Sequence, residues 1–226
     1  MKKFLVAIDQ GTTSTRVILF DVNGNKKFIS QFEIKQYFPK NGWVEHNPNE
    51  IWETTLRSLK KVIKKAKELK GKILSIGITN QRETTVLWNK KNGRPIYNAI
   101  VWQDRRTQKY CQNLKKSNYE NNIRKKTGLF IDPYFSATKI KWILDNVKKS
   151  KKLLKTNNLL FGTIDSFLIW KLTKGKKHLT EATNASRTML FNINTNKWDK
   201  NILKKLKIPS KILPEVKNSA DDFGIT

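Results

Sequence analysis

The sequence predicts an α/β fold in which a mixed sheet is flanked by helices, and two observations support this prediction. Strand-like apolar runs open the chain, and a long amphipathic segment with helical spacing follows them. After that segment, residues 73–79 are apolar almost without a break, as in strands that are covered on both faces. A chain of 226 residues is also long enough to bury a sizeable core.

The N-terminus is expected to form a β-hairpin. Residues 4–8 are apolar and lead directly into a polar turn. Residues 16–21 have the pattern of a second strand, and Asn23-Gly24 after them is a strong signal for another tight turn. A third strand is expected at 27–34, so that the first three strands form a meander.

The first helix is expected to begin at Asn47, because Asn47 can cap its N-terminus and Pro48 suits the first helical position. Apolar residues then recur at helical spacing, with lysines mostly on the opposite side. The expected apolar face consists of Trp52, Leu56, Leu59, Ile63 and Ala66. Gly71 ends the helix, and residues 73–79 form a strand that we expect at the centre of the sheet.

The rest of the chain alternates short strands, turns and helices. Asn92-Gly93 is expected to be a turn, and the lysine-rich residues 148–158 a surface connection. Extended segments are expected at 84–89 and 96–102, helices at 107–116, 119–126, 136–145 and within 197–214, and buried apolar segments at 159–162 and 164–172. No linker, internal repeat or domain boundary is evident, so residues 1–226 are expected to form one domain.

The net charge of +28 arises from 38 lysines and eight arginines against 18 acidic residues. The lysines are scattered along the whole chain, whereas proteins that bind nucleic acid usually gather arginines, whose forked guanidinium recognises bases and phosphates. We therefore interpret the lysines as solvated helix faces and expect no nucleic-acid partner. A surface for polyanions is the alternative.

The single cysteine, Cys111, excludes an intramolecular disulfide framework and fits a reducing cytoplasm. We expect it to be a packing residue, not a nucleophile. No stretch approaches 18 uninterrupted apolar residues, and the residues before the first strand are too few for a signal peptide. The sequence therefore predicts a cytoplasmic protein without a membrane span.

Polar residues follow the first strand at the hairpin turn. Gly11 permits a tight turn that brings backbone amides close to a ligand, and Thr12, Thr13 and Ser14 add hydroxyl donors. Such donors suit phosphate oxygens, and Asp9 can hold the water shell of a Mg²⁺ ion that bridges them. The sequence therefore predicts a phosphate site on a β-hairpin. A plain hairpin with a polar tip is the alternative.

A second group of polar and aromatic residues suits a small polyol. Arg82 and Glu83 follow strand 73–79, and ligands of open α/β sheets bind beyond the carboxyl ends of strands. The guanidinium can donate to hydroxyls and the carboxylate can accept from them. Trp102 can pack against the carbon side of a sugar, and Tyr134 can donate to a hydroxyl. A surface ion pair or a simple turn is the alternative for Arg82 and Glu83.

Six segments resemble the FGGY family of carbohydrate kinases, which belongs to the superfamily of actin, hexokinase and the chaperone ATPases. Within that family they are most similar to the kinases of glycerol. The segments are D-Q-G-T-T-S-T-R (9–16), P-K-N-G-W-V-E-H-N-P (39–48), I-T-N-Q-R-E-T-T (78–85), I-Y-N-A-I-V-W-Q-D-R-R (96–106), D-P-Y-F-S (132–136) and N-A-S-R-T-M-L-F-N (184–192). They occur in order over nearly the whole chain. The resemblance implies a ribonuclease-H-like lobe with a mixed sheet flanked by helices.

The resemblance also implies an activity, namely the ATP-dependent phosphorylation of glycerol to sn-glycerol 3-phosphate, with ATP and Mg²⁺ bound. By this similarity Arg82, Glu83 and Tyr134 contact the glycerol hydroxyls, and Trp102 packs along its carbons. The residues implied to contact the nucleotide phosphates are Thr12, Thr13, Ser14 and Arg16, with Asp9 near Mg²⁺.

Members of that family are considerably longer than this chain. The resemblance therefore implies that the general-base aspartate and the adenosine site lie beyond Thr226, and we expect Asp221 and Asp222 to be loop residues. The chain is expected to be the N-terminal, glycerol-binding lobe of such a kinase, inactive alone, with the C-terminal lobe as its partner. A kinase of another polyol or ketose, a non-catalytic truncated lobe and a homo-oligomer stay open.

Overall fold

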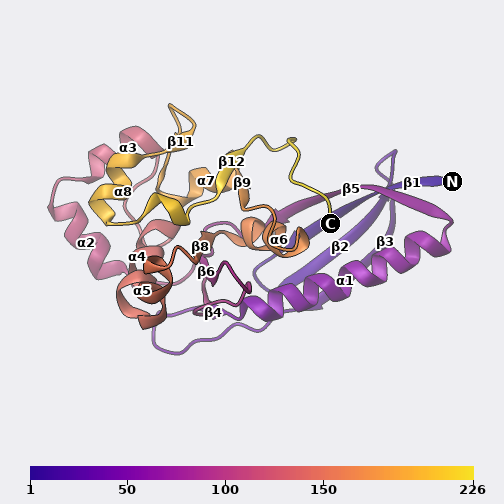
Figure 1. The fold of residues 1–226 in the computed structure, drawn as a ribbon, viewed down its shortest axis with the longest axis horizontal. Helices are drawn as coiled ribbons and strands as arrows, with labels where there is room; N and C mark the ends of the chain where they lie inside the picture. Colours follow the sequence, from indigo (N-terminus) through magenta and orange to yellow (C-terminus); the bar gives the residue numbers. More distant parts are fainter. The chain divides into compact units, whose positions relative to one another are not determined.

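The computed structural model describes all of residues 1–226, which form two compact units (Figure 1). Unit 1 comprises Met1–Gln36 and His46–Gln81, and unit 2 comprises Tyr37–Glu45 and Arg82–Thr226. The chain crosses between the units within irregular segments and within the short strand β4 (Glu45–His46). Because no Gly- or Pro-rich linker marks these crossings, the sequence did not predict the division.

Unit 1 is built on a mixed four-stranded sheet, as predicted. Strands β1 (Lys2–Gln10), β2 (Ser14–Asp21) and β3 (Lys26–Glu33) form an antiparallel meander, and β5 (Gly71–Asn80) pairs in parallel with β1. The strand order is β3-β2-β1-β5. Alternate residues of the two central strands are buried, which gives the sheet one strongly apolar face.

Helix α1 (Pro48–Glu68) runs along this sheet in Figure 1. Its buried face is turned by about one position from the predicted one, so that Trp52 and Leu56 are only half-buried and Ile63 is 38% exposed. The buried side includes the small polar residues Thr55 and Ser58, which cannot be identified from the spacing of apolar residues. The buried residues are Pro48, Ile51, Thr55, Ser58, Leu59, Val62 and Ala66.

The prediction that strand 73–79 lies at the centre of a covered sheet is wrong. The strand exists as β5, but it forms the edge of the sheet, and its residues are half-buried or exposed. Leu74 is 49% exposed. An apolar run on both faces of a strand is typical of a central position, but burial depends on the neighbours, and no strand of the chain pairs with the outer edge of β5.

Unit 2 consists of helices and paired short strands. The pairs are β4 with β7 (Ala99–Ile100), β6 (Val86–Asn89) with β8 (Leu159–Gly162), β9 (Leu179–Glu181) with β12 (Glu215–Lys217), and β10 (Phe191–Asn192) with β11 (Lys197–Trp198). The α-helices are α2 (Gln108–Lys116), α3 (Glu120–Thr127), α4 (Ser136–Asn146), α5 (Lys148–Lys155), α6 (Ile164–Leu172), α7 (Ala182–Ala185) and α8 (Lys200–Leu206), with 3-10 turns at Ser186–Thr188 and Ser210–Ile212.

Most of these elements were predicted, with one clear error. Residues 148–158 do not form a surface connection, because most of them belong to helix α5. Within the lysine-rich stretch, Ser150 and Leu153 are buried and give the helix one face that packs. The Ser150 hydroxyl donates to the carbonyls of Leu144 and Val147 at 3.1 and 2.7 Å, which fixes the junction between α4 and α5.

A fully buried guanidinium fixes the aromatic segment of unit 2 that precedes α1. The Arg106 side chain is 0% exposed and donates to Glu45 at 2.7 Å and to Asp104 at 2.8 Å. Its guanidinium carbon lies 3.8 Å from the ring centre of Trp43 and 4.7 Å from that of Trp142. Asp104 also accepts from the backbone N–H of Val44 at 2.6 Å. Carboxylates and aromatic rings thus join three distant segments through one side chain.

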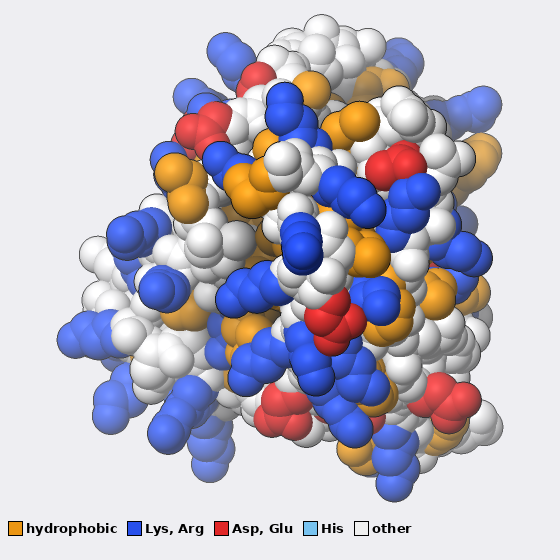
Figure 2. Space-filling model, turned by 90° about the vertical axis from the view of Figure 1, so that its right-hand side faces the viewer, with side chains coloured by type: hydrophobic (Ala, Val, Ile, Leu, Met, Phe, Trp, Pro, Cys, Tyr) orange, Lys and Arg blue, Asp and Glu red, His pale blue; other side chains and the backbone are white.

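The face of the molecule drawn in Figure 2 carries many positive charges. Figure 2 shows one face of the molecule, on which Lys and Arg side chains are spread widely and hydrophobic side chains lie between them. This distribution favours the interpretation of the lysines as solvated faces. No helix combines the length and the apolar character that crossing a bilayer requires.

Cys111 is buried in the apolar core of unit 2, as expected of a packing residue. Burial raises the pKa of its thiol to about 11, although hydrogen bonds with Thr138 and Thr107 act in the opposite direction. Because the thiolate is the reactive form, a thiol with this pKa is unreactive near neutral pH.

We predict that Asn47→Ala lowers the free energy of unfolding by about 1 kcal/mol. The Asn47 side chain accepts from the backbone N–H of Asn49 at 3.0 Å and so satisfies one of the orphan donors at the start of α1. Urea unfolding followed by circular dichroism measures the loss. Asn49→Ala is the control, because the exposed Asn49 side chain makes no cap; equal losses in both variants would contradict the assignment.

We predict that acid destabilises unit 1 partly through His46. Burial lowers the pKa of His46 to about 4 from 6.5. The unfolded chain therefore takes up the proton first as the pH falls from 6.5 to 4, and His46 lowers the free energy of unfolding by up to about 1.4 kcal/mol per pH unit. His46→Gln should lose less stability across this window when unfolding is measured at each pH. Parallel pH profiles for the variant and the parent protein would refute the assignment.

Candidate functional site

The tip of the first hairpin in unit 1 is tightly closed. The N–H of Gly11 donates to the carbonyl of Ser14 at 2.9 Å, which joins β1 to β2. A Cβ at Gly11 would lie 3.3 Å from that same carbonyl oxygen, closer than most Cβ contacts. Thr13 is exposed and Thr12 half-buried, so the two threonines form the accessible part of the turn.

Amide side chains fix the backbone behind this turn. The carbonyl of Gly11 accepts from Gln10 Nε2 at 2.7 Å and from Gln81 Nε2 at 3.1 Å. Gln81 Nε2 also lies 3.2 Å from Nδ1 of the buried His46. Since this carbonyl is held from behind, the turn presents its threonine side chains and backbone amides with little freedom, which suits an anion site.

The two charged residues predicted for the nucleotide lie directly opposite each other on β1 and β2. Asp9 and Arg16 are paired in the sheet register, and their side chains are 3.4 Å apart and partly exposed. The Nε atom of Arg16 is buried and has no hydrogen-bond partner. Ser14 is buried, and its hydroxyl accepts from Gln31 at 3.0 Å, so it is less accessible to a ligand than the exposed Thr13.

A magnesium ion fits this donor set only as a phosphate-bound ion. No group of three or more His, Cys, Asp or Glu side chains could hold a metal in this chain. Asp9 supplies a single, partly exposed carboxylate. Mg²⁺ is usually held by one or two carboxylates together with substrate phosphates and water, so one carboxylate beside a phosphate-binding turn is compatible with it.

In unit 2, three of the four predicted polyol-binding residues lie together. The ring centres of Trp102 and Tyr134 are 5.5 Å apart. Arg187 connects this aromatic pair to Glu83, because its Nε donates to Glu83 Oε1 at 2.7 Å and its guanidinium carbon lies 5.9 Å from the Tyr134 ring centre. Arg82 is exposed and forms no ion pair in the structure, so its guanidinium is accessible to a ligand.

The backbone at Glu83 is strained. Glu83 has φ +63°, a left-handed conformation that is uncommon outside glycine. The N–H of Thr84 donates to the carbonyl of Arg82 at 2.7 Å and closes a three-residue turn around it. Such a conformation costs about 1–3 kcal/mol and is found mostly at ligand sites. Here it turns the Glu83 carboxylate into the protein, where it is 4% exposed.

The turn that carries Tyr134 is held by Asp132. Its Oδ1 atom accepts from the backbone N–H of Tyr134 at 2.9 Å and from Arg105 Nη1 at 2.8 Å. Helix α4 begins two residues after Tyr134. The phenol is therefore fixed between a side-chain-capped turn and a helix.

Sequence reasoning missed the central role of Arg187. The residue belongs to the N-A-S-R-T segment that was noted for its resemblance, but no contact was predicted for it. Its partner Glu83 is 104 positions away in the sequence. The only available signal was its place in a distinctive motif, because spacing alone cannot reveal so distant a pair.

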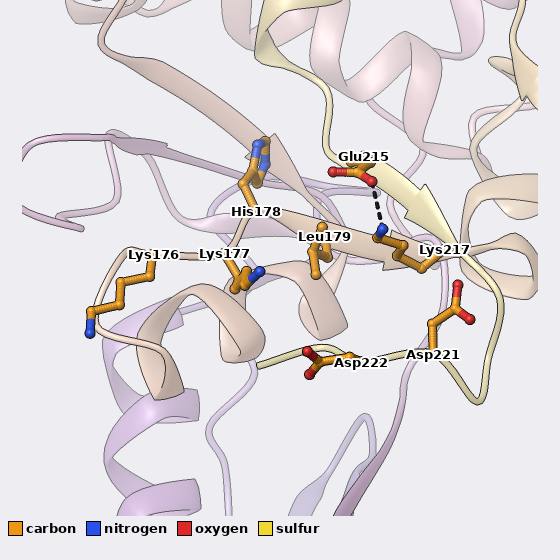
Figure 3. Close-up of a pocket in the computed structure, with 8 residues that line it drawn as sticks. All are labelled: Lys176, Lys177, His178, Leu179, Glu215, Lys217, Asp221 and Asp222. Carbon is orange, nitrogen blue, oxygen red and sulfur yellow. Dashed lines mark ion pairs between the residues drawn. The ribbon is translucent and has the colours of Figure 1, made fainter. Parts of the chain in front are cut away.

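A separate cavity of about 670 Å³ lies in unit 2, and none of the predicted site residues lines it (Figure 3). It is lined by residues 176–179, Glu215, Lys217, Asp221 and Asp222, and Figure 3 shows Glu215 paired with Lys217. Asp221 and Asp222 are exposed loop residues, as predicted. The charges around this cavity are mixed and exposed to solvent, so it does not define a site.

Comparisons with known proteins match this architecture. Residues 4–226 match the model of the N-terminal domain of the FGGY family of carbohydrate kinases. The chain is 55% identical over 226 residues to the glycerol kinase of Petrotoga mobilis and 56% identical over 225 residues to that of Lactobacillus acidophilus, and it covers 45% of each. It therefore spans about half the length of these relatives.

Solved structures give the same result. The crystal structure of Plasmodium falciparum glycerol kinase with ADP superposes with a TM-score of 0.93 at 37% identity, over 99% of this chain and 44% of that one. Gluconate kinase from Lactobacillus acidophilus superposes with a TM-score of 0.85 at 26% identity, over 96% of this chain and 42% of that one. The chain therefore belongs to the FGGY family of carbohydrate kinases.

Proposed function

We propose that the whole protein transfers the γ-phosphoryl group of ATP to glycerol and forms sn-glycerol 3-phosphate in the cytoplasm. The observation that carries this proposal is the cluster of Glu83, Arg187, Trp102 and Tyr134 in unit 2, which offers one carboxylate and two aromatic rings to a small polyol. The 55% identity to a protein named glycerol kinase supports the same substrate.

In the proposed polyol site, each residue has a distinct role. The Trp102 and Tyr134 rings form an apolar wall for the carbon chain, and the Tyr134 phenol can donate to a hydroxyl. Arg187 holds Oε1 of Glu83, and Oε2, which lies outside that ion pair, accepts from a substrate hydroxyl. The exposed Arg82 donates to a second hydroxyl. Neutral hydroxyls are thus recognised by charged groups, of which Glu83 is held by Arg187 before the substrate arrives.

In the proposed nucleotide site, the hairpin of unit 1 binds the phosphates. Thr12 and Thr13 and the backbone amides of the turn donate to phosphate oxygens, and Ser14 supports the turn. Arg16 supplies positive charge, which is the main requirement of phosphoryl transfer. Asp9 would hold a Mg²⁺ ion directly or through water, and such an ion would supply further positive charge to the phosphates.

The group that accepts the proton of the glycerol hydroxyl is proposed to lie in the C-terminal part of the whole protein. None of the described carboxylates near the polyol cluster is placed for this role, because Glu83 is paired with Arg187 and Asp132 with Arg105. The match covers 45% of the glycerol kinase of Petrotoga mobilis, so more than half of that relative lies outside the matched part. We therefore expect residues 1–226 alone to turn over glycerol negligibly.

The deciding experiment is a substrate panel on the whole protein with ATP and Mg²⁺. Glycerol should be the preferred acceptor among glycerol, gluconate, xylulose and other small polyols, as measured by kcat/KM. Preference for a ketose or a sugar acid would support a different kinase of the family, which the structural similarity to gluconate kinase makes the second candidate. Binding of glycerol without turnover would indicate a non-catalytic protein.

We predict that Arg82→Ala in the whole protein raises the KM for glycerol by about 100-fold, because it removes a charged donor from the polyol hydroxyls. Arg94→Ala is the matched control, since Arg94 is an exposed arginine of the same unit without an ion pair. Steady-state kinetics at saturating ATP measures both. An unchanged KM in Arg82→Ala would remove Arg82 from the site.

We predict that Asp9→Asn raises the Mg²⁺ concentration required for half-maximal activity by about tenfold, because a neutral amide is a weaker ligand for Mg²⁺ than a carboxylate. Asp21→Asn is the control, since Asp21 is a carboxylate at the other end of β2 and pairs with Lys27 at 2.8 Å. Activity is titrated with Mg²⁺ at fixed ATP. Identical Mg²⁺ curves for the parent protein and Asp9→Asn would contradict the proposed position of the ion.

A further inference from the structure

Lys139 of helix α4 is a lysine with no exposed surface. Lysine is almost never fully buried, because removing its charge from water is costly. No carboxylate forms an ion pair with it. Its Nζ atom instead donates to three backbone carbonyls, those of Tyr134 at 2.8 Å, Glu83 at 3.0 Å and Val101 at 3.3 Å. The three N–H bonds of one ammonium group thus contact three acceptors.

These three carbonyls belong to the three segments that carry the predicted polyol-binding residues. Glu83 and Tyr134 are themselves candidate residues, and Val101 precedes Trp102. The segments are far apart in the sequence, and the contacts from Lys139 to Glu83 and Val101 span 56 and 38 positions. Lys139 is therefore a single point at which the backbones of all three segments meet.

We propose that Lys139 is a positioning residue of the polyol site, which sets the relative positions of Glu83, Trp102 and Tyr134 and thereby the affinity for a glycerol-sized substrate. The inference rests on the proposed function, because the site is assigned to a polyol there. Lys139 itself does not contact the substrate.

The partners of the carbonyls show why Lys139 acts as a connection between segments. The carbonyl of Val101 also accepts from the N–H of Asp104 at 3.1 Å, and that of Glu83 from the Ser136 hydroxyl at 3.0 Å. Without Lys139, the carbonyl of Val101 keeps its local donor Asp104, and the carbonyl of Glu83 keeps the Ser136 hydroxyl, which lies 53 positions away in α4. What is lost is the single group that joins all three segments at one point.

The strained turn at Glu83 gives this link a further effect. Glu83 has φ +63°, and both donors to its carbonyl, Lys139 and Ser136, come from the first turn of α4. A residue in this conformation persists only where its surroundings hold it. Loss of one of these two donors weakens the hold on the carbonyl, so we expect the turn to relax and the Glu83 carboxylate to shift relative to Arg187.

The charges around Lys139 agree with such a role. Burial lowers the pKa of its ammonium group to about 7, and Arg106 acts in the same direction, whereas the carboxylates of Glu83, Asp104 and Asp132 oppose it. A buried cation without a direct carboxylate partner is retained at a cost to stability. In return for this loss of stability, the protein gains the three contacts of Lys139 with backbone carbonyls.

The test uses the whole protein with Lys139→Met, which keeps the length of the side chain and removes its donors. We expect the Kd of glycerol, measured by calorimetry, to rise by about 10- to 100-fold, because misplacement by a fraction of an ångström suffices for such an effect. The KM for ATP should change less than twofold. A glycerol Kd within twofold of the parent value would overturn the proposal.

Leu144→Ala is the matched control for a loss of stability. Leu144 is buried in the same helix, its apolar side chain cannot donate to any of the three carbonyls, and its truncation leaves a cavity in the core. If Lys139→Met weakens glycerol binding only through general loss of stability, Leu144→Ala should weaken it equally when the two variants are equally destabilised. That result would overturn the proposal.

Hydrogen exchange provides a readout that needs no glycerol. In Lys139→Met, the amides of residues 82–85, 101–104 and 132–135 should exchange faster, while Leu144→Ala should leave them unchanged. Unchanged exchange in all three segments would overturn the proposal even if glycerol binds. A different result is a parent protein that fails to bind glycerol while the Lys139→Met and Leu144→Ala variants show the expected exchange. That result would contradict the proposed function and support the connecting role of Lys139.

A milder pair of variants covers the case in which Lys139→Met does not fold. Ser136→Ala removes the second donor to the Glu83 carbonyl and should raise the glycerol Kd by about threefold, in line with one neutral hydrogen bond. Ser150→Ala removes an equally buried hydroxyl that donates only to the carbonyls of Leu144 and Val147, and should not change it. Equal glycerol Kd values in both serine variants would overturn the proposal.

Discussion

Unit 2 depends on the burial of one guanidinium. Arg106 is removed from water and is surrounded by Glu45, Asp104 and the rings of Trp43 and Trp142. Removal of one partner from such a group typically costs about 3–5 kcal/mol, because the remaining charge is left buried without compensation. Since these partners come from three separate segments, the segment before α1, the loop after β7 and helix α4 are fixed as one body. Trp102 of the polyol cluster lies in that loop, and Tyr134 lies two residues before α4.

Two buried cations thus support one site by different means. Arg106 pairs with carboxylates and stacks on rings, which fixes side chains, whereas Lys139 contacts only carbonyls, which fixes backbone. The result is that the main chain at Glu83 and Tyr134 is held from within the protein. A site whose supporting contacts are complete before the substrate arrives loses little entropy on binding.

The sequence allowed much of the fold to be predicted, because the local signals agreed with the final structure. Asn47-Pro48 marked the start of α1, and the N-terminal meander and helices α2 to α4 followed from periodicity. The errors concern burial that depends on distant neighbours: β5 resembles a central strand but forms an edge, and α5 lies in a stretch whose lysines hide its buried face.

The candidate site was predicted in part for the same reason. Glu83, Trp102 and Tyr134 belong to distinctive motifs, and the structure brings them together. Arg187 and Lys139, which join them, were not predicted, since one of 38 lysines cannot be singled out as buried without the tertiary contacts that bury it. Ser14 illustrates the reverse case, because a motif position suited to phosphate is largely occupied by a contact within the sheet.

The position of β5 at the edge of the sheet has a consequence for handling the isolated chain. No strand of the chain pairs with its outer edge, and its residues include exposed Leu74 and only one charged residue, Lys72. Natural edge strands usually carry several charges, a proline or a bulge that discourages another strand from adding to them. In β5 the features of this kind are the single charge of Lys72 and the bulge at Leu74, where the pairing with β1 shifts register. Strand addition between copies of residues 1–226 is therefore opposed at the start of β5 and much less along residues 75–80.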